Sequence, residues 1–360
     1  MDLHGWGEVV VAPVTITPTK PLTPTHVKGL LWTDVLVRAT SMLTPTRLVW
    51  NPRLAHLTTQ TTAFWDHLDR TEPDTDWTGE SELGIGARYV NFHRDRAAVD
   101  PRALDPYFAR IETDGWIHPA ARRLLEWWRR EFDLLGVADP GLTDDRPLNS
   151  SAESVRRQLA ARRMLIDHRR FGGPVYLDGA RWGMPIRHLI GADGHANYLM
   201  PILRELLPMI RPERLFLLVY DDALAADYLL LDRVLTEFGA TVARLSLSRV
   251  AIDGAVRSSR YGGWSGSTLA EISATRGSAD EAAYRLGMRL YFVGVLDRRS
   301  RPSFRMDLLR RCVGRAARLA GEEHEDAPLR LTPEGYVDPR RLTVALLGRH
   351  RKSAPKAVFG

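Results

Sequence analysis

The feature that most constrains the fold of this chain is a continuous apolar segment followed by a Thr- and Pro-rich loop and a helix. Residues 8–16 include the uninterrupted run Val9-Val10-Val11, which is typical of a strand buried on both faces of a parallel sheet. Residues 27–38 place apolar side chains at helical spacing, and His26 falls where that helix begins. A strand, a tight loop and a helix N-terminus form an anion site, because free N–H groups and the helix dipole both face the ligand. The segment therefore predicts a nucleotide phosphate site with His26 at its rim, and the alternative is an ordinary strand-to-helix connection with a surface histidine.

A second unit of the same kind follows later in the chain. Residues 46–50 read as a second strand, and residues 215–219 and 241–247 read as two further strands with a helix predicted over 224–238. Strand–helix–strand units of this kind build parallel sheets. We therefore predict an α/β fold with a doubly wound parallel sheet, whose ligands bind at the carboxyl ends of the strands where the strand order reverses.

An insertion separates the two halves, from about residue 70 to residue 185. Residues 70–117 are rich in Asp, Gly, Arg and Pro and are expected to be irregular, whereas residues 119–135 form a strong amphipathic pattern between Pro119 and Gly136. Gly84 to Tyr89 begins like a dinucleotide fingerprint but lacks its third glycine. The predicted domains are a nucleotide-binding domain over 1–300 that contains this insertion, and a small helical C-terminal region with a basic tail over 301–360.

Composition narrows the class of protein. The chain has 360 residues, 44% of them hydrophobic, which is enough for a large α/β core. No apolar run is long enough to span a bilayer and no secretory signal is visible, so a cytoplasmic location is expected. Cys312 is the only cysteine, which excludes intrachain disulfides and cysteine-rich zinc sites, and no protein-held metal site is predicted. The net charge of +6 comes almost entirely from arginine, so a phosphate near the middle of the chain must be met by arginine, histidine or backbone.

Two polar loops supply the other candidate residues. Gly191, Asp193 and His195 follow a predicted strand end and are expected to converge with His26 from the opposite half. The alternative is that Asp193 and His195 cap a helix beginning at Ala196. Residues 257–266 form a loop rich in Gly, Ser and Arg, whose arginines are either phosphate ligands or solvated loop charges.

Taken in order, these segments resemble the motifs of class I aminoacyl-tRNA synthetases, and most closely those of arginyl-tRNA synthetases. Thr15 to His26 resembles Ser-Ala-Asn-Pro-Thr-Gly-Pro-Leu-His-Val-Gly-His, with Asp34 and Arg38 at the matching offsets. Gly191 to His195 resembles Gly-Ala-Asp-His-His, and Val256 to Gly263 resembles Val-Lys-Met-Ser-Lys-Arg-Ala-Gly. The resemblance extends over about residues 8 to 310.

The resemblance implies an ATP-dependent ligase that activates an amino acid or related carboxylate as an acyl-adenylate, with Mg²⁺ accompanying the ATP. The activated acyl group would pass to a tRNA 3′ end or to a small amine. In this scheme His26 contacts the α-phosphate, and Arg257 and Arg260 bind the departing pyrophosphate. The remaining nucleotide-site residues that the resemblance implies are Thr23, Thr25, Gly191, Asp193, His195 and Ser259.

Several positions depart from the family pattern. Thr23 and Thr25 replace a histidine and a glycine of the first motif. Arg257 and Arg260 replace the two lysines of the motif Val-Lys-Met-Ser-Lys. The segment that holds the arginine side chain is absent, and the anticodon-binding bundle is missing or reduced to the region after Ser300. These departures motivate an alternative, a catalytically inactive synthetase paralogue that binds tRNA or a protein partner. A hydrolase is the least favoured alternative. Residues 263–267 resemble the nucleophile elbow Gly-x-Ser-x-Gly of hydrolases, but Ser267 stands where that motif has its second glycine.

Overall fold

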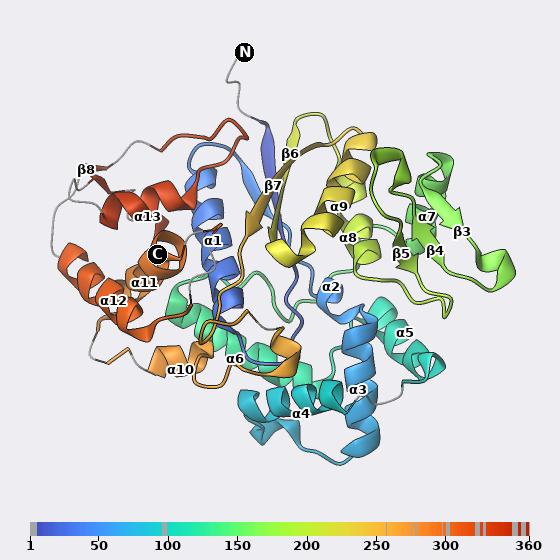
Figure 1. Cartoon of the computed structure of the whole chain (residues 1–360), viewed down its shortest axis with the longest axis horizontal. Coiled ribbons are helices and arrows are strands. Elements are labelled where there is room, and N and C mark those ends of the chain that lie inside the picture. Colours follow the sequence, from blue (N-terminus) through green and yellow to red (C-terminus); the bar gives the residue numbers. More distant parts are fainter. Residues whose placement is uncertain are drawn as a thin grey trace.

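The computed structural model describes residues 6–95, 99–256, 258–274, 276–277, 279–296, 298–299, 303–320, 325–326, 329–347, 352–353 and 358–359. Its centre is a four-stranded parallel sheet in the order β2-β1-β6-β7 (Figure 1). The strands are β1 (Glu8–Pro13), β2 (Thr46–Leu48), β6 (Arg214–Asp221) and β7 (Thr241–Leu247). The predicted parallel α/β sheet is confirmed. Because the chain moves from β1 to β2 on one side and to β6 on the other, the strand order reverses between β1 and β6, and their carboxyl ends flank a crevice.

Both faces of this sheet are buried, which explains the continuous apolar run in β1. Val9 and Val11 face one core, whereas Val10 and Ala12 face the other. The first core is covered by α1 (Pro24–Ser41), α6 (Pro119–Leu135), α10 (Leu269–Ala274), α11 (Glu281–Arg289), a π-helix (Leu290–Val295), α12 (Met306–Ala320) and α13 (Pro339–Leu347). The second is covered by α7 (Ala152–Ala161), α8 (Leu199–Leu206) and α9 (Ala225–Glu237). The bounds predicted for the helix over 119–135 and the strand over 241–247 are those observed.

The insertion is more regular than its composition predicts. After α2 (Pro52–His56) and α3 (Thr59–Thr71), residues 70–117 contain α4 (Glu82–Arg94) and α5 (Asp105–Asp114), so the expectation of an irregular segment is wrong. In α4 the buried residues Ile85, Tyr89 and Phe92 fall on one helical face, and they supply the packing that stabilises a helix with weak local signals. The Gly84 to Tyr89 segment lies inside this helix and is no phosphate-binding turn.

A separate antiparallel sheet follows the insertion helices. Its strands are β3 (Leu165–Asp167), β4 (Val175–Leu177) and β5 (Arg187–Ile190), in the order β3-β4-β5, and it lies beside α7 at the right of Figure 1. The strand that precedes Gly191 is therefore β5 of this small sheet and is no member of the parallel sheet.

The C-terminal helices share the core of the parallel sheet. Leu309 of α12 and Leu346 of α13 belong to the same buried cluster as Val9 of β1. Two short strands, β8 (Glu325–Asp326) and β9 (Lys352–Ser353), pair in parallel beyond them. None of the described helices combines the length and apolar character that crossing a bilayer requires.

Candidate active site

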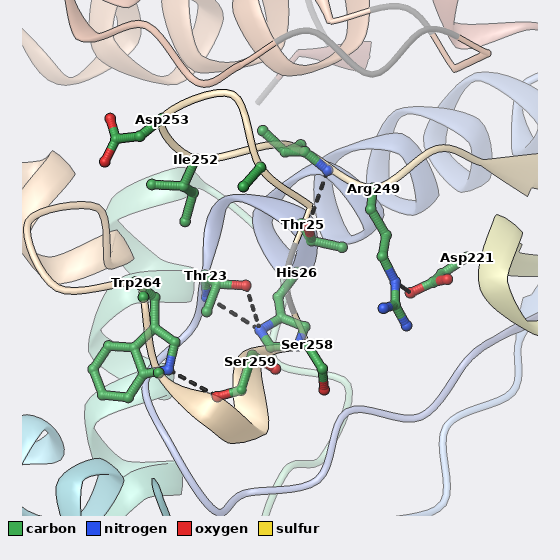
Figure 2. A pocket seen from close by; sticks show the side chains of 14 residues that line it. Thr23, Thr25, His26, Asp221, Arg249, Ile252, Asp253, Ser258, Ser259 and Trp264 are labelled. Carbon is green, nitrogen blue, oxygen red and sulfur yellow. Dashed lines mark hydrogen bonds and ion pairs between the residues drawn. The ribbon is translucent and has the colours of Figure 1, made fainter.

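A polar cavity of about 190 Å³ lies at the crevice where the strand order reverses (Figure 2). Four separate segments line it: the start of α1, the end of β6, the residues just after β7 and the loop that runs to Trp264. Of the residues singled out in the sequence, Thr23, Thr25, His26 and Ser259 line this cavity. The structure thus brings the first motif and the Gly-, Ser- and Arg-rich loop together across more than two hundred residues of chain.

The His26 ring is held at the first turn of α1 by Thr23. The backbone N–H of Thr23 donates to Nδ1 of His26 over 3.1 Å, so Nδ1 is an acceptor and the ring proton sits on Nε2. Burial, together with the positive charges of Lys20 and Arg249, lowers the pKa of His26 well below its ordinary value. His26 is therefore a neutral imidazole whose Nε2–H is available to donate to an anion in the cavity.

Two cationic side chains, Lys20 and Arg249, lie near this histidine, and Arg260 lies near Lys20. We call Lys20, Arg249 and Arg260 the cationic cluster. Lys20 is only 5% exposed, and its ammonium lies 5.3 Å from the centre of the Tyr89 ring. Within the described part of the chain no carboxylate forms an ion pair with Lys20, and burial together with the charge of Arg260 lowers its pKa to about 8. A buried ammonium without a counter-ion is an electrostatic cost that a bound anion would offset.

The two arginines of the cluster differ in their partners. Nη2 of Arg260 donates to Oε1 of Gln60 over 2.9 Å, which turns Arg260 toward α3 and leaves it off the wall of the cavity. Nε of Arg249 donates to Oδ2 of Asp221 over 2.7 Å at the carboxyl end of β6 (Figure 2). Arg249 and Asp221 were not predicted from the sequence. Asp221 ends β6 and Arg249 comes just after β7. The sequence predicted both strands, so the rule that ligands bind at the carboxyl ends would have found these residues.

The loop between β7 and α10 is tied down at several points. Nε1 of Trp264 donates to the carbonyl oxygen of Ser259 over 2.9 Å. Gly262 adopts φ 78° and ψ −148°, a region open only to glycine, at the turn that faces the cavity. A Cβ on Gly86 of α4 would lie 2.6 Å from Pro21 and 2.8 Å from Trp264, so this glycine lets α4 support both cavity loops at once.

Three glutamates lie near one another behind the loop: the partly buried Glu271 of α10 and the buried Glu82 and Glu131 of α4 and α6. Glu271 accepts the backbone N–H groups of Gly266 and Thr268 over 2.9 and 2.8 Å, which fixes the end of the loop. Burial and the neighbouring charge of Glu271 raise the pKa of Glu82, and burial and the charge of Glu82 raise that of Glu131. Glu82 and Glu131 therefore favour their protonated forms in the folded protein.

Gly191, Asp193 and His195 lie elsewhere, so their predicted convergence with His26 is wrong. They form the turn after β5, in which Asp193 accepts the backbone N–H of His195 over 3.0 Å. Nε2 of His195 lies 2.8 Å from Oδ1 of Asp105, and its ring stacks on Phe108 of α5. None of these residues lines the cavity, because β5 belongs to the small antiparallel sheet. The alternative, that Asp193 and His195 cap a helix beginning at Ala196, is also wrong, because α8 begins at Leu199.

The remaining site residues predicted from the sequence are Arg257 and Thr25. Arg257 lies outside the described residues. The hydroxyl of Thr25 accepts the backbone N–H of Val250 over 3.0 Å, which joins the first turn of α1 to the segment after β7. Asp34 and Arg38, four residues apart on α1, pair over 2.8 Å. Among the residues that the structure describes, no group of three or more His, Cys, Asp or Glu side chains is placed to hold a metal ion.

Comparison with known proteins supports the fold. No family model matches the chain, and no curated protein matches it by sequence. Among solved structures, an arginyl-tRNA synthetase from Thermus thermophilus has a TM-score of 0.54 and 15% identity, covering 95% of this chain and 69% of that one. The enzyme from Plasmodium falciparum has a TM-score of 0.57 and 13% identity, covering 87% and 57%. A protein from Campylobacter jejuni assigned as an arginyl-tRNA synthetase has a TM-score of 0.53 and 13% identity, covering 83% and 65%. The chain thus spans between 57% and 69% of these proteins and shares its fold with arginyl-tRNA synthetases at low sequence identity.

Proposed function

We propose that this protein uses ATP to activate an amino acid or related carboxylate as an acyl-adenylate. The observation that carries the proposal is the cavity in which His26, at the N-terminus of α1, meets the loop that follows β7 beside the cationic cluster. A polyphosphate is favoured by a helix N-terminus together with one buried ammonium, Lys20, and two partly buried guanidiniums, Arg249 and Arg260. The fold shared with arginyl-tRNA synthetases supports the same reaction class.

The proposed step is an in-line displacement at phosphorus. A carboxylate oxygen attacks the α-phosphorus of ATP, the bond from that phosphorus to the bridging oxygen breaks, and pyrophosphate leaves with the electron pair. No proton has to move, so the protein contributes positioning and charge stabilisation. The Nε2–H of His26 would donate to an oxygen of the α-phosphate. Lys20 and Arg260 lie off the cavity wall, and Arg260 would have to leave Gln60 for the two to balance the charge of the departing pyrophosphate. The same role for Arg257 is supported only by the resemblance of its loop to the synthetase motif.

Mg²⁺ fits this site as a companion of the triphosphate. It prefers oxygen ligands and is commonly held by one or two carboxylates together with phosphate oxygens. Asp221 and Asp253 are the carboxylates on the cavity wall. Since Asp221 is paired with Arg249, Asp253 is the residue that we expect to hold the ion, which would supply charge neutralisation.

The test is isotope exchange between pyrophosphate and ATP, stimulated by single amino acids and carboxylates. We expect one compound class to stimulate exchange, and His26→Ala to lower the rate by about 10²-fold or more, the cost of removing one donor to developing charge. His188→Ala, which alters an exposed histidine on β5, is the control and should leave the rate unchanged. Absence of exchange with every compound, together with absence of ATP binding by calorimetry, would refute the proposal. The acyl acceptor is a tRNA 3′ end or a small amine, and acyl transfer from the isolated adenylate distinguishes them.

One observation favours the second candidate, an inactive paralogue that binds tRNA or a protein partner. The bond from Val250 to Thr25 draws the walls of the cavity together, and its volume of about 190 Å³ is below the 300 Å³ or so at which small-molecule pockets usually begin. ATP binding decides between the two candidates. A chain that binds tRNA but gives no heat with ATP and Mg²⁺ fits the second.

A further inference from the structure

A second cavity, of about 390 Å³, opens beside the first at the carboxyl ends of β1 and β6. Thr25, His26 and Asp221 line both cavities, so the two share a wall. The second cavity lies on the α1 side of the parallel sheet and is closed by the segment that follows α6. Its volume falls within the range of small-molecule pockets, about 300–1,000 Å³.

The wall of this second cavity is chiefly apolar. Aromatic and branched side chains from the β1–α1 loop, α1, α6 and the ends of the strands face it. Those that define its shape are Ile16, Leu30, Val37, Trp50, Phe132 and Leu247. Such a wall offers dispersion contacts and burial to a hydrocarbon group, and it offers few hydrogen bonds.

The carboxylates on this wall are already paired. Asp34 contacts Nε of Arg38 over 2.8 Å and Nη2 of Arg289 over 2.6 Å. At the mouth, Asp221 contacts Nε of Arg249 over 2.7 Å. The cationic end of a side chain that enters the cavity would meet no carboxylate on this wall that lacks a partner, so its burial would cost free energy. The described residues therefore disfavour a cationic ligand here, although the proteins of similar fold are named for arginine.

We infer that the second cavity holds the body of the carboxylate substrate, and that this body is a large apolar group, either aromatic or branched aliphatic. The inference rests on the proposed function, because the shared wall at Thr25 and His26 would place the carboxylate of such a ligand beside the phosphate cavity. It goes beyond the proposed function by assigning a substrate class, and this class excludes arginine.

Ligand binding without ATP tests the assignment. The purified chain is titrated with anilinonaphthalene sulfonate, whose fluorescence reports apolar cavities, and then with L-phenylalanine, L-leucine, L-arginine and adenosine as competitors. We expect displacement by phenylalanine or leucine and none by arginine. Displacement by arginine or adenosine alone would overturn the inference, as would the absence of displacement by any competitor.

A substitution that fills the second cavity tests the same assignment by mutation. Gly29 of α1 lines the cavity, and a Cβ at this position would meet no atom within 4 Å, so Gly29→Leu enters open space. We expect it to weaken apolar carboxylate binding by about tenfold or more. Gly314→Leu, at an exposed helical glycine that also has no atom within 4 Å, should leave binding unchanged. Equal affinity in Gly29→Leu and the parent chain would place the ligand elsewhere.

The same variants separate this inference from the proposed function. Exchange that is stimulated by arginine and survives Gly29→Leu would refute the apolar substrate class while leaving adenylate formation intact. Binding of apolar carboxylates that Gly29→Leu abolishes, without any exchange and without ATP binding, would support the cavity assignment and refute the adenylating activity.

Discussion

Replacing Lys20 by methionine tests the electrostatics of the site most directly, because it removes a buried charge while retaining a long side chain over Tyr89. The pKa of Lys20 is lowered from 10.5 to about 8 by burial and by Arg260. This difference corresponds to about 3 kcal/mol of penalty for the protonated form in the folded protein. The cation–π contact with Tyr89 offsets about 0.5–1 kcal/mol of this penalty. Lys20→Met should therefore raise the free energy of unfolding by about 2 kcal/mol at pH 7.

The effect should depend on pH with a defined sign. Below pH 8 Lys20 is protonated in both states and the full penalty applies. Between pH 8 and 10.5 the unfolded chain binds a proton that the folded chain lacks, so the parent protein gains stability relative to Lys20→Met. Urea unfolding followed by tryptophan fluorescence at pH 7, 8, 9 and 10 measures the difference, which should shrink as the pH rises.

Lys28→Met is the matched control for this experiment. The Lys28 ammonium is equally buried, but it donates to the carbonyl and hydroxyl oxygens of Ser248 over 3.0 and 2.9 Å, so its loss should destabilise the protein. In the same series Lys20→Met should weaken pyrophosphate binding, and above pH 8 the parent chain should take up a proton on binding while the variant does not. If Lys20→Met destabilises the protein at pH 7 as Lys28→Met does, or if its effect is the same at every pH, the account of Lys20 as an unpaired buried cation is wrong.

Two further predictions concern stability. Burial and the charge of Glu82 raise the pKa of Glu131, so the parent protein loses stability as the pH rises above the ordinary carboxyl range. The free energy of unfolding of Glu131→Gln should therefore exceed that of the parent by about 1 kcal/mol or more at pH 8 and equal it near pH 5. Glu126→Gln, on the exposed face of the same helix, should show no such pH dependence in the same urea titrations. A Cβ on Gly287 of α11 would lie 2.5 Å from the backbone of α12, so Gly287→Ala should lower the free energy of unfolding by about 1–3 kcal/mol. Gly314→Ala, with open space at its Cβ, should raise it by up to about 1 kcal/mol, and equal effects of the two alanines would contradict the close packing of these helices.

Local sequence patterns determined the parallel sheet and part of the site. Val9 to Val11 can be buried without alternation only in a strand covered on both faces, and the bounds of α6 follow from Pro119 and Gly136 at its ends. That the loop before His26 and the loop that carries Ser259 share one site was implied by the resemblance to the synthetase motifs. The inferences on the sheet and on α6 hold because periodicity and turn residues record which face of an element is buried and where the element ends.

The tertiary structure alone decided which elements meet. The pattern before Gly191 predicts a strand, but it carries no information on the sheet that the strand joins, and β5 pairs with β4 in the small antiparallel sheet. Similarly, nothing near Lys20 marks it as buried. Its environment arises where α4 and the loop around Arg260 close over it, at positions tens to hundreds of residues away. Such contacts depend on packing free energies summed over distant segments, and a window of local sequence does not contain them.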